Sequence, residues 1–230
     1  MRQLRFKHIP KNGGTYIRKS TLNKSLFNKY DKDKGYKNIT VNKTHKFLNI
    51  KLRSNPKSWS KHIPLSFYPK SYLKKYHFFV IIRNPYDRVI SAINHFFITI
   101  IQGNENSINN HKNMDKTKQN LIIIFILPLI HLYNSFYYLK IPYFEHFLPQ
   151  VKYYSTRHKK KCNFILYDNY NQELRQLYKK YGILFKKGHP VTYKKKTKYT
   201  NRLWEISKII IRFLYNDDFK IHNKLKNKNI

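Results

Sequence analysis

Acidic residues and cysteine are scarce in this chain. Its 230 residues include 47 Lys and Arg against 11 Asp and Glu, so the formal net charge is +36. Such a charge favours an acidic partner, such as a nucleotide, a polyanionic acceptor or nucleic acid. Because lysine, asparagine, isoleucine and tyrosine recur along the whole chain, a biased composition explains the charge equally well. The single cysteine, Cys162, excludes an intramolecular disulfide and is predicted to be a buried, inert thiol.

Long apolar runs are also missing. The longest, from Leu121 to Ile130, is interrupted by Pro128 and has about half of the roughly 20 residues that a membrane-spanning helix needs. We therefore predict that this run is a buried helix or a pair of strands. The first ten residues are a basic strand rather than a signal peptide. On these grounds the sequence predicts a soluble protein and leaves its compartment unknown.

Three segments have the pattern of a strand followed by a turn and a helix. They begin with the alternating run Leu4 to Ile9, the apolar run Phe78 to Ile82 and the run Phe164 to Tyr167. A continuous apolar run is typical of a parallel strand that is buried on both faces. Strands that alternate with helices indicate an α/β fold. We predict a P-loop-like, three-layer sandwich in which helices flank a central, mainly parallel sheet.

The helices and the domain limits follow from capping and periodicity. Asn84 is a suitable N-cap, Pro85 suits the first helical position, and apolar residues recur at helical spacing from Val89 to Ile100. A last helix is predicted from about 201 to 215. We predict one domain over residues 1–219, a mobile loop at 103–120 because that stretch is polar and without periodicity, and a frayed basic tail at 220–230.

The segment Pro10-Lys11-Asn12-Gly13-Gly14-Thr15 follows the first strand directly. A glycine-containing turn that opens a helix presents backbone N–H groups to an anion. The segment has a lysine but no Gly-Lys-Ser/Thr ending, so it is not the Walker A motif. A lysine placed before the glycines argues against nucleoside triphosphatases and favours transfer of a sulfuryl group.

A second motif follows the second strand, from Arg83 to Ser91. One guanidinium and one hydroxyl, two helical turns apart, can both reach a single phosphate. Lys11 and Arg83 both follow the carboxyl ends of strands, where α/β proteins bind ligands, so we predict that they serve one site. The alternative for Arg83 is an ion pair with Asp87 at the helix start. Asp87 and Arg88 are predicted to be structural, through pairing on the helix surface.

These two motifs together resemble the cofactor-binding elements of sulfotransferases that use PAPS (3′-phosphoadenosine 5′-phosphosulfate). The sequence of the first motif is similar to that of the membrane-associated, Golgi-type carbohydrate branch. Three further segments resemble that branch in the same order, namely His146-Phe147-Leu148-Pro149-Gln150, Asn163 to Tyr170 and Tyr215-Asn216-Asp217-Asp218-Phe219. Departures are the short chain, the missing N-terminal anchor and the absence of disulfides.

The resemblance implies a role for each motif residue. Lys11 would stabilise the leaving group, Gly13, Gly14 and Thr15 would bind the 5′-phosphate together with Asn12 of the same loop, and Arg83 and Ser91 would bind the 3′-phosphate. The reaction needs no metal, and no Cys/His cluster has metal-ligand spacing in the sequence.

The acceptor hydroxyl needs a general base, for which histidine is the usual residue near neutral pH. His45 lies between the two motifs, where the resembling branch has its catalytic histidine, and we predict that it is the base. It follows a predicted strand at 37–41, and its alternative is an exposed loop histidine. His146 is the second candidate, and His8 is predicted to be structural.

The sequence therefore predicts a PAPS-dependent sulfotransferase whose acceptor is a glycan or another hydroxyl-bearing molecule. A P-loop-type kinase is one alternative, although the chain lacks a clear magnesium-binding carboxylate on a second strand. A basic, non-enzymatic nucleic-acid-binding protein is another, although no binding module is recognisable. An inactive sulfotransferase-like protein is the third. Membrane association and a Golgi location rest on the resemblance alone.

Overall fold

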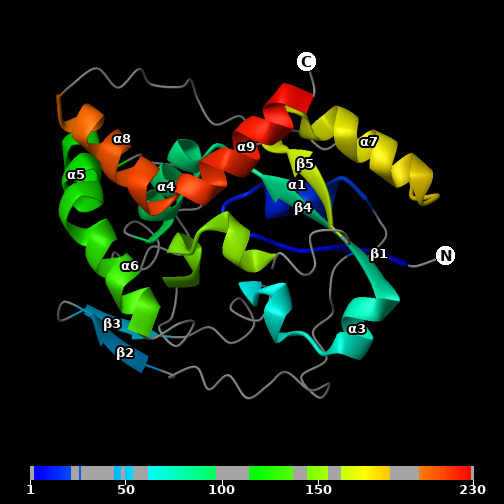
Figure 1. The fold of residues 1–230 in the computed structure, drawn as a ribbon, viewed down its shortest axis with the longest axis horizontal. Helices are drawn as coiled ribbons and strands as arrows, with labels where there is room; N and C mark the ends of the chain where they lie inside the picture. The colour runs from blue at the N-terminus through cyan, green and yellow to red at the C-terminus, as the bar shows by residue number, and fades with distance from the viewer. Residues whose placement is uncertain are drawn as a thin grey trace.

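A three-stranded parallel sheet lies at the centre of the protein, as Figure 1 shows for the computed structural model. The structure describes residues 3–21, 26, 44–47, 50–53, 62–96, 114–136, 144–154, 162–186 and 202–228. The strands are β1 (Gln3–Phe6), β4 (Tyr76–Ile82) and β5 (Cys162–Leu166), in the order β1-β4-β5. Phe6 pairs with Phe79, and Ile82 pairs with Leu166, so all three strands run in one direction. The three predicted strands are thus confirmed.

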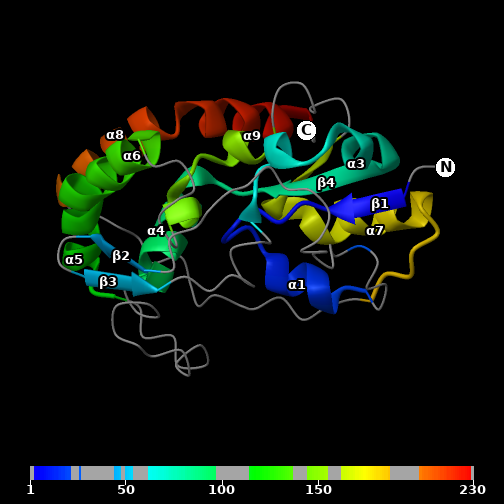
Figure 2. The same cartoon turned by 90° about the horizontal axis from the view of Figure 1, so that it is seen from below.

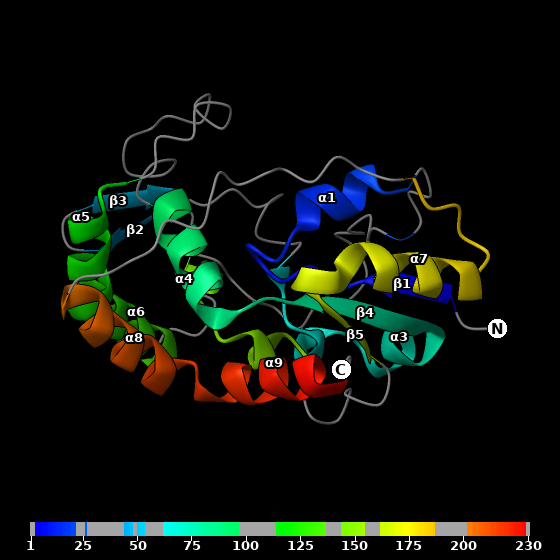
Figure 3. The ribbon, with the colours of Figure 1, turned by 90° about the horizontal axis from the view of Figure 1, so that it is seen from above.

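Helices cover both faces of this sheet. Helices α1 (Gly14–Lys19) and α7 (Tyr170–Lys180) lie on one face, and α3 (Lys70–Lys75) and α9 (Asn216–Lys228) lie on the other (Figures 2 and 3). The alternation of side chains along β4 explains the two layers. Phe79 and Ile81 pack with α1 and α7, whereas the residues between and beside them pack on the opposite face. The α/β sandwich is therefore confirmed.

A second group of helices packs beside the sheet around its own apolar cluster (Figure 1). It comprises α4 (Pro85–Asn94), α5 (Lys116–Leu121), the π-helical turn η6 (Ile122–Ile126), α6 (Leu127–Phe136) and α8 (Arg202–Leu214). The apolar run from Leu121 to Ile130 is helical, as one of the two predicted alternatives. Among the described residues, the continuous stretch Lys116–Phe136 is the one helix long and apolar enough to cross a membrane by length and composition. Core helices of soluble proteins also pass that test, and about a third of the apolar window is buried.

Two predicted boundaries differ from the structure. Helix α5 begins inside the predicted loop at 103–120, because the Asp115 side chain caps it by accepting a hydrogen bond from the Lys118 N–H at 3.1 Å. Residues 101–113 lie outside the described part of the chain. The predicted frayed tail at 220–230 is helical as far as Lys228. Its apolar residues Ile221 and Leu225 pack against the core, and this anchors a segment that appears only basic and polar in the sequence.

Two short strands, β2 (Thr44–Phe47) and β3 (Ile50–Arg53), form a separate antiparallel pair. His45 pairs with Leu52 in this sheet. It therefore lies within a strand, whereas the sequence predicted that it follows one. The predicted strand at 37–41 falls outside the described residues. Among the described residues, 3-10 turns also occur between helices and strands, namely η3 (Leu65–Phe67), η7 (Phe144–Phe147), η8 (Gln150–Tyr153) and η10 (Tyr167–Asn169).

Candidate active site

The carboxyl ends of the three parallel strands bring Lys11, Arg83 and Tyr167 together. Arg83 follows β4, and its Nη1 donates a hydrogen bond to the Lys11 carbonyl oxygen at 3.0 Å. Tyr167 comes directly after β5, and the centre of its ring lies 4.9 Å from the Arg83 guanidinium. The structure thus places Lys11 and Arg83 side by side at one edge of the sheet, as their positions after strands predicted. Tyr167 was not among the predicted site residues, although its place at the end of the third strand was a usable signal.

The loop between β1 and α1 has a left-handed backbone at two positions. Lys11 has φ 64° and Gly13 has φ 82°. Non-glycine residues adopt this region rarely, and such strain is concentrated at functional sites. Gly13 is the N-cap of α1, and its carbonyl oxygen accepts a hydrogen bond from the Ile17 N–H at 3.2 Å. Thr15 is the second residue of α1. The loop therefore holds the Lys11 backbone in a defined, locally strained conformation.

His8 lies directly beneath the loop. A Cβ atom at Gly14 would lie 2.1 Å from His8 Nε2 and 2.5 Å from His8 Cδ2, both far inside van der Waals contact. Burial and the neighbouring positive groups lower the pKa of His8 well below its usual value, so its ring is neutral. Glycine at position 14 thus allows the loop to rest on the His8 ring.

Replacing Gly14 with alanine should therefore destabilise the protein by about 1–3 kcal/mol, the usual cost of overpacking. The added methyl group must displace the His8 ring or the loop itself. The measurement is urea unfolding at neutral pH. Gly182→Ala is the control for backbone strain without crowding, because Gly182, unlike Gly14, has a positive φ (63°) and has open space around its Cβ position. The double variant Gly14→Ala/His8→Ala should recover part of the loss, and a double variant that recovers none of it would contradict the steric explanation.

The Asn12 side chain is buried and anchors the loop to the core. Its Nδ2 donates to the Ile81 carbonyl oxygen at 2.6 Å and to Gln150 Oε1 at 2.5 Å. Its backbone N–H donates to the Ile9 carbonyl oxygen at 3.3 Å. These contacts fix the position of the loop, and the role of Asn12 in cofactor binding stays a prediction. The sequence had grouped Asn12 with the cofactor-binding residues.

Gln150 links this anchor to the second motif. Its Oε1 also accepts from the Arg83 N–H at 3.0 Å, and its Nε2 donates to the Arg83 carbonyl oxygen at 2.9 Å. Its own N–H donates to Asp218 Oδ2 at 2.7 Å, and the Val151 N–H donates to Asp218 Oδ1 at 3.0 Å. A fully buried side chain therefore holds the two motifs in register. Gln150 was noticed in the sequence only as part of a resembling segment, without a role.

The closing segment of the chain holds the segment that carries Gln150. Tyr215 donates a hydrogen bond from its hydroxyl to the Phe147 carbonyl oxygen at 2.7 Å, and Asp218 caps η8 through the two N–H groups described above. The Phe219 ring lies 4.7 Å from the Tyr86 ring of α4. Two of the resembling segments, far apart in the sequence, thus pack on one another directly behind the site.

The second motif begins as predicted. Asn84 caps α4, because its Oδ1 accepts from the Tyr86 N–H at 3.0 Å, and Pro85 occupies the first turn. Ser91 lies two turns into the helix and is half-buried. Arg88 differs from the prediction of surface pairing. It is almost completely buried and donates to the Pro10 and His146 carbonyl oxygens at 3.3 and 3.1 Å, so it binds the loop from behind.

A family model for the sulfotransferase domain matches residues 6–199. The chain belongs to the sulfotransferase family. The matched range includes the loop with Lys11, the helix start at Arg83 and strand β5. Membership in this family implies transfer of a sulfuryl group to an acceptor that bears a hydroxyl. Comparisons with curated proteins and with solved structures give no match.

The surroundings of Lys11 in this sulfotransferase lower the pKa of its side chain. Burial, with a smaller contribution from the positive charge of Arg83, lowers the pKa of Lys11 from 10.5 to about 8. Lys11 is therefore still mostly protonated at pH 7 and can act as a cation. Each positive group raises the cost of charging the other, so a bound anion would favour the charged form of both. The arrangement is thus suited to a ligand with several negative charges.

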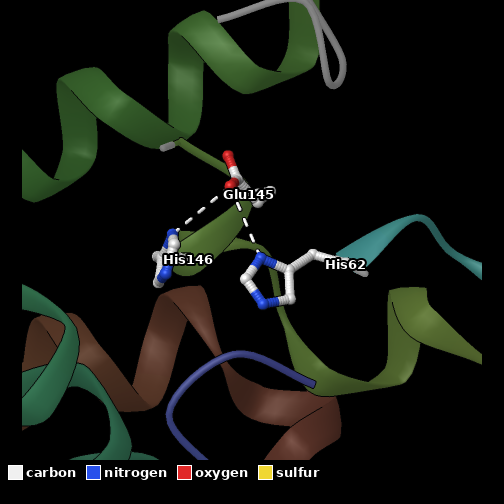
Figure 4. A group of neighbouring side chains, drawn as sticks. All are labelled: His62, Glu145 and His146. Atoms are coloured by element: carbon white, nitrogen blue, oxygen red, sulfur yellow. Dashed lines mark ion pairs between the residues drawn. The ribbon is translucent and has the colours of Figure 1, made fainter. Parts of the chain in front are cut away.

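Four histidines and one glutamate gather next to the loop of the sulfotransferase. Glu145 Oε1 lies 3.6 Å from His62 Nδ1 and 3.5 Å from His146 Nδ1 (Figure 4). The His8 ring lies 4.8 Å from that of His62, and the His95 ring lies 5.1 Å from that of His146. Sequence spacing could not reveal this cluster, because its members come from β1–α1, from the segment before η3, from α4 and from η7.

Burial changes the protonation of these groups. It lowers the pKa of His62 to about 4, partly opposed by Glu145, and lowers that of His95 to about 2, with Lys11 as the next cause. Burial opposes ionisation of Glu145, but His146 and His62 together lower its pKa to about 2. At neutral pH the glutamate is charged and both His62 and His95 are neutral. Burial likewise raises the pKa of Cys162 to about 12, in agreement with the predicted inert thiol, although Cys162 is half-buried and not fully buried as predicted.

The structure describes the side chain of only one of the two candidate bases. His146 lies on η7, inside the histidine cluster and one residue from Glu145. His45 is described only by its backbone in β2, and its side chain lies outside the described part of the structure. Its role as base stays a prediction.

Proposed function

We propose that the protein transfers a sulfuryl group from PAPS to the hydroxyl of a carbohydrate acceptor. The observation that carries this proposal is the pairing of Lys11 and Arg83 at the ends of adjacent strands in a chain of the sulfotransferase family. PAPS offers a phosphosulfate at one end and a 3′-phosphate at the other. Two cations on neighbouring strand ends, fixed through one buried glutamine, suit a donor with two anionic ends.

Each residue has a role that its position supports. Lys11 stabilises the charge that develops on the bridging oxygen as the sulfur–oxygen bond of the donor breaks. The amides of Gly13, Gly14 and Thr15 at the start of α1 bind the 5′-phosphate. Arg83 and Ser91 bind the 3′-phosphate. Positioning and electrostatics dominate this chemistry, as they do in phosphoryl transfer.

The acceptor side of the reaction needs a base and a cationic surface. The acceptor oxygen forms the new bond to sulfur, and its proton passes to histidine, for which we propose His45. A glycan acceptor is supported by the four segments that resemble the carbohydrate branch, and the formal charge of +36 suits an acidic glycan.

Replacing His45 with alanine should lower kcat on the order of 10²-fold, because general-base catalysis contributes about that much. The measurement is steady-state transfer from labelled PAPS. His77→Ala is the control, since His77 lies on β4 and contacts Tyr181 rather than the loop. Unchanged kcat in His45→Ala would shift the base to His146.

Calorimetry tests the donor, and a labelled assay tests the acceptor. At physiological salt the protein should bind adenosine 3′,5′-bisphosphate more tightly than ATP, because only the first has the 3′-phosphate that Arg83 would bind. Equal affinities would reject PAPS as donor. Labelled PAPS offered with glycans, lipids and tyrosine peptides should transfer its label to a glycan, and transfer only to another class would reject the carbohydrate acceptor.

A further inference from the structure

Two histidines and a glutamate from distant segments meet in the interior beside the active-site loop. His62 precedes η3, whereas Glu145 and His146 are adjacent on η7 (Figure 4). Their exposed fractions are 6%, 1% and 5%. We propose that these three side chains bind a divalent transition-metal ion, with Zn²⁺ the best fit, through the two Nδ1 atoms and the Glu145 carboxylate.

The separations fit a shared metal better than direct hydrogen bonds. The two Nδ1 atoms lie 3.6 and 3.5 Å from Glu145 Oε1, beyond the usual limit of about 3.2 Å for an N–H···O hydrogen bond. With metal–ligand distances of about 2.1 Å, neighbouring ligands of a tetrahedral zinc ion lie roughly 3.4 Å apart. The three candidate ligand atoms also all lie within 4.8 Å of one another. One ion can therefore touch all three after small movements.

Two of the buried atoms in this group lack partners. Within the part of the chain that the structure describes, Glu145 Oε2 and His62 Nδ1 have no hydrogen-bond partner and are inaccessible to solvent. Buried polar atoms without partners are costly and call for an explanation, for which an ion is one of the recognised answers. A metal between the Nδ1 atoms and the carboxylate would satisfy both atoms. The lack of a partner at Glu145 Oε2 is independent of the distances measured from Oε1.

The donor set selects the class of metal. Two imidazoles and one carboxylate are a ligand set that zinc adopts in proteins, with one position left for water or a further ligand. Ca²⁺ and Mg²⁺ prefer six or more oxygen ligands, which these residues do not supply. Soft ions such as Cu(I) prefer sulfur, and Cys162 is not among these ligands. The rings of His8 and His95 pack against those of His62 and His146, respectively.

The backbone around the ligands is held in place. Asn134 Nδ2 donates to the Phe144 carbonyl oxygen at 3.2 Å, and the Tyr153 hydroxyl donates to the Glu145 carbonyl oxygen. An ion would fasten the segment before η3 to η7, and η7 leads directly to Gln150. We therefore assign the metal a stabilising role next to the site. This inference does not depend on sulfuryl transfer, so either proposal can fail without the other.

Metal titration of the full chain tests the site. After dialysis against a chelator, calorimetry with ZnCl₂ should show one tight site per chain, and Zn²⁺ should raise the melting temperature. Co²⁺ in place of Zn²⁺ should give the strong visible bands of tetrahedral coordination in the unaltered protein. Absence of binding, or an octahedral Co²⁺ spectrum, would overturn the proposal without the need for any variant.

Substitutions then identify the ligands. His62→Gln and Glu145→Gln should each weaken Zn²⁺ binding on the order of 100-fold, whereas His222→Gln should leave it unchanged. His222 is a matched control, because it lies on α9 with an exposed fraction of 5% and an Nε2 atom that also lacks a partner among the described residues. Unchanged affinity in both ligand variants, or an equal loss in the control, would overturn the assignment. Circular dichroism identifies variants that fail to fold.

Discussion

Replacing Lys11 with alanine should lower kcat for sulfuryl transfer by roughly 10²–10³-fold, the loss seen when one group that stabilises developing charge is removed. Binding of adenosine 3′,5′-bisphosphate should be largely retained, because Lys11 is proposed to act where charge appears only in the transition state. The fold should also survive. Alanine can keep the left-handed backbone at φ 64° at a strain cost similar to that of lysine.

Lys19→Ala is the control for this substitution. Lys19 is exposed in the last turn of α1, the helix that follows the loop, and its replacement removes the same charge. Unchanged kcat in Lys11→Ala, or an equal loss in both variants, would remove the leaving-group role. A large loss of bisphosphate affinity would instead assign Lys11 to ground-state binding. The two measurements together therefore separate catalysis from binding.

The pH profile of the unaltered protein gives a second, independent measure of Lys11. Because burial and Arg83 lower its pKa from 10.5 to about 8, Lys11 loses its charge as the pH rises through about 8. The kcat/KM for PAPS reports groups of the free enzyme, so it should fall above pH 8 rather than above pH 10. The falling limb should be absent from the residual activity of Lys11→Ala.

The arrangement of the sheet could be predicted because its signals are local. The apolar run from Phe78 to Ile82 identifies a buried strand, and the Asn84-Pro85 pair identifies the helix start that follows it. Because the carboxyl ends of parallel strands lie at one edge of the sheet, the sequence predicts that Lys11 and Arg83 lie close together. The same reasoning, applied to the third strand, would have added Tyr167.

The supports behind the site could not be predicted in this way. Gln150 contacts Asn12 across 138 residues of sequence, and no local pattern identifies such a pair. Asp218 was noticed only within a resembling segment, yet it caps η8 with both of its oxygens. The C-terminal helix shows the same difficulty. Ile221 and Leu225 pack against the core, and this contact cannot be recognised from the sequence around them. Local sequence patterns therefore identify the candidate site residues, whereas the residues that hold them in place come from distant parts of the chain.

Arg88 is the clearest case of a residue whose role depends on tertiary structure. In the sequence it follows Asp87 and is predicted to pair on the helix surface, but its side chain is among the largest that are completely buried. It joins the loop at Pro10 to η7 at His146 by donating to both carbonyl oxygens. It is also the main charge that lowers the pKa of Asp218, against the larger opposing effect of burial.

Replacing Arg88 with alanine should therefore lower the free energy of unfolding by about 3–5 kcal/mol, as expected when one member of a buried polar network is removed. Two buried carbonyl oxygens lose a donor, Asp218 loses its compensating charge, and a cavity is left. The measurement is urea unfolding at neutral pH. Arg175→Ala is the control, since Arg175 is exposed on α7, and its removal should change stability by less than about 0.5 kcal/mol.

The pH dependence of this loss distinguishes the charge of Arg88 from its volume. Burial, partly opposed by Arg88, raises the pKa of Asp218 from 3.8 to about 6, so the folded state binds more protons than the unfolded state between these values. Stability from this group is present at low pH and is lost as the pH rises to about 6. Without Arg88 the pKa of Asp218 should rise further, which extends the loss above pH 6. The deficit of Arg88→Ala should thus be larger at pH 8 than at pH 5, whereas a deficit that does not change with pH would assign the effect to packing alone.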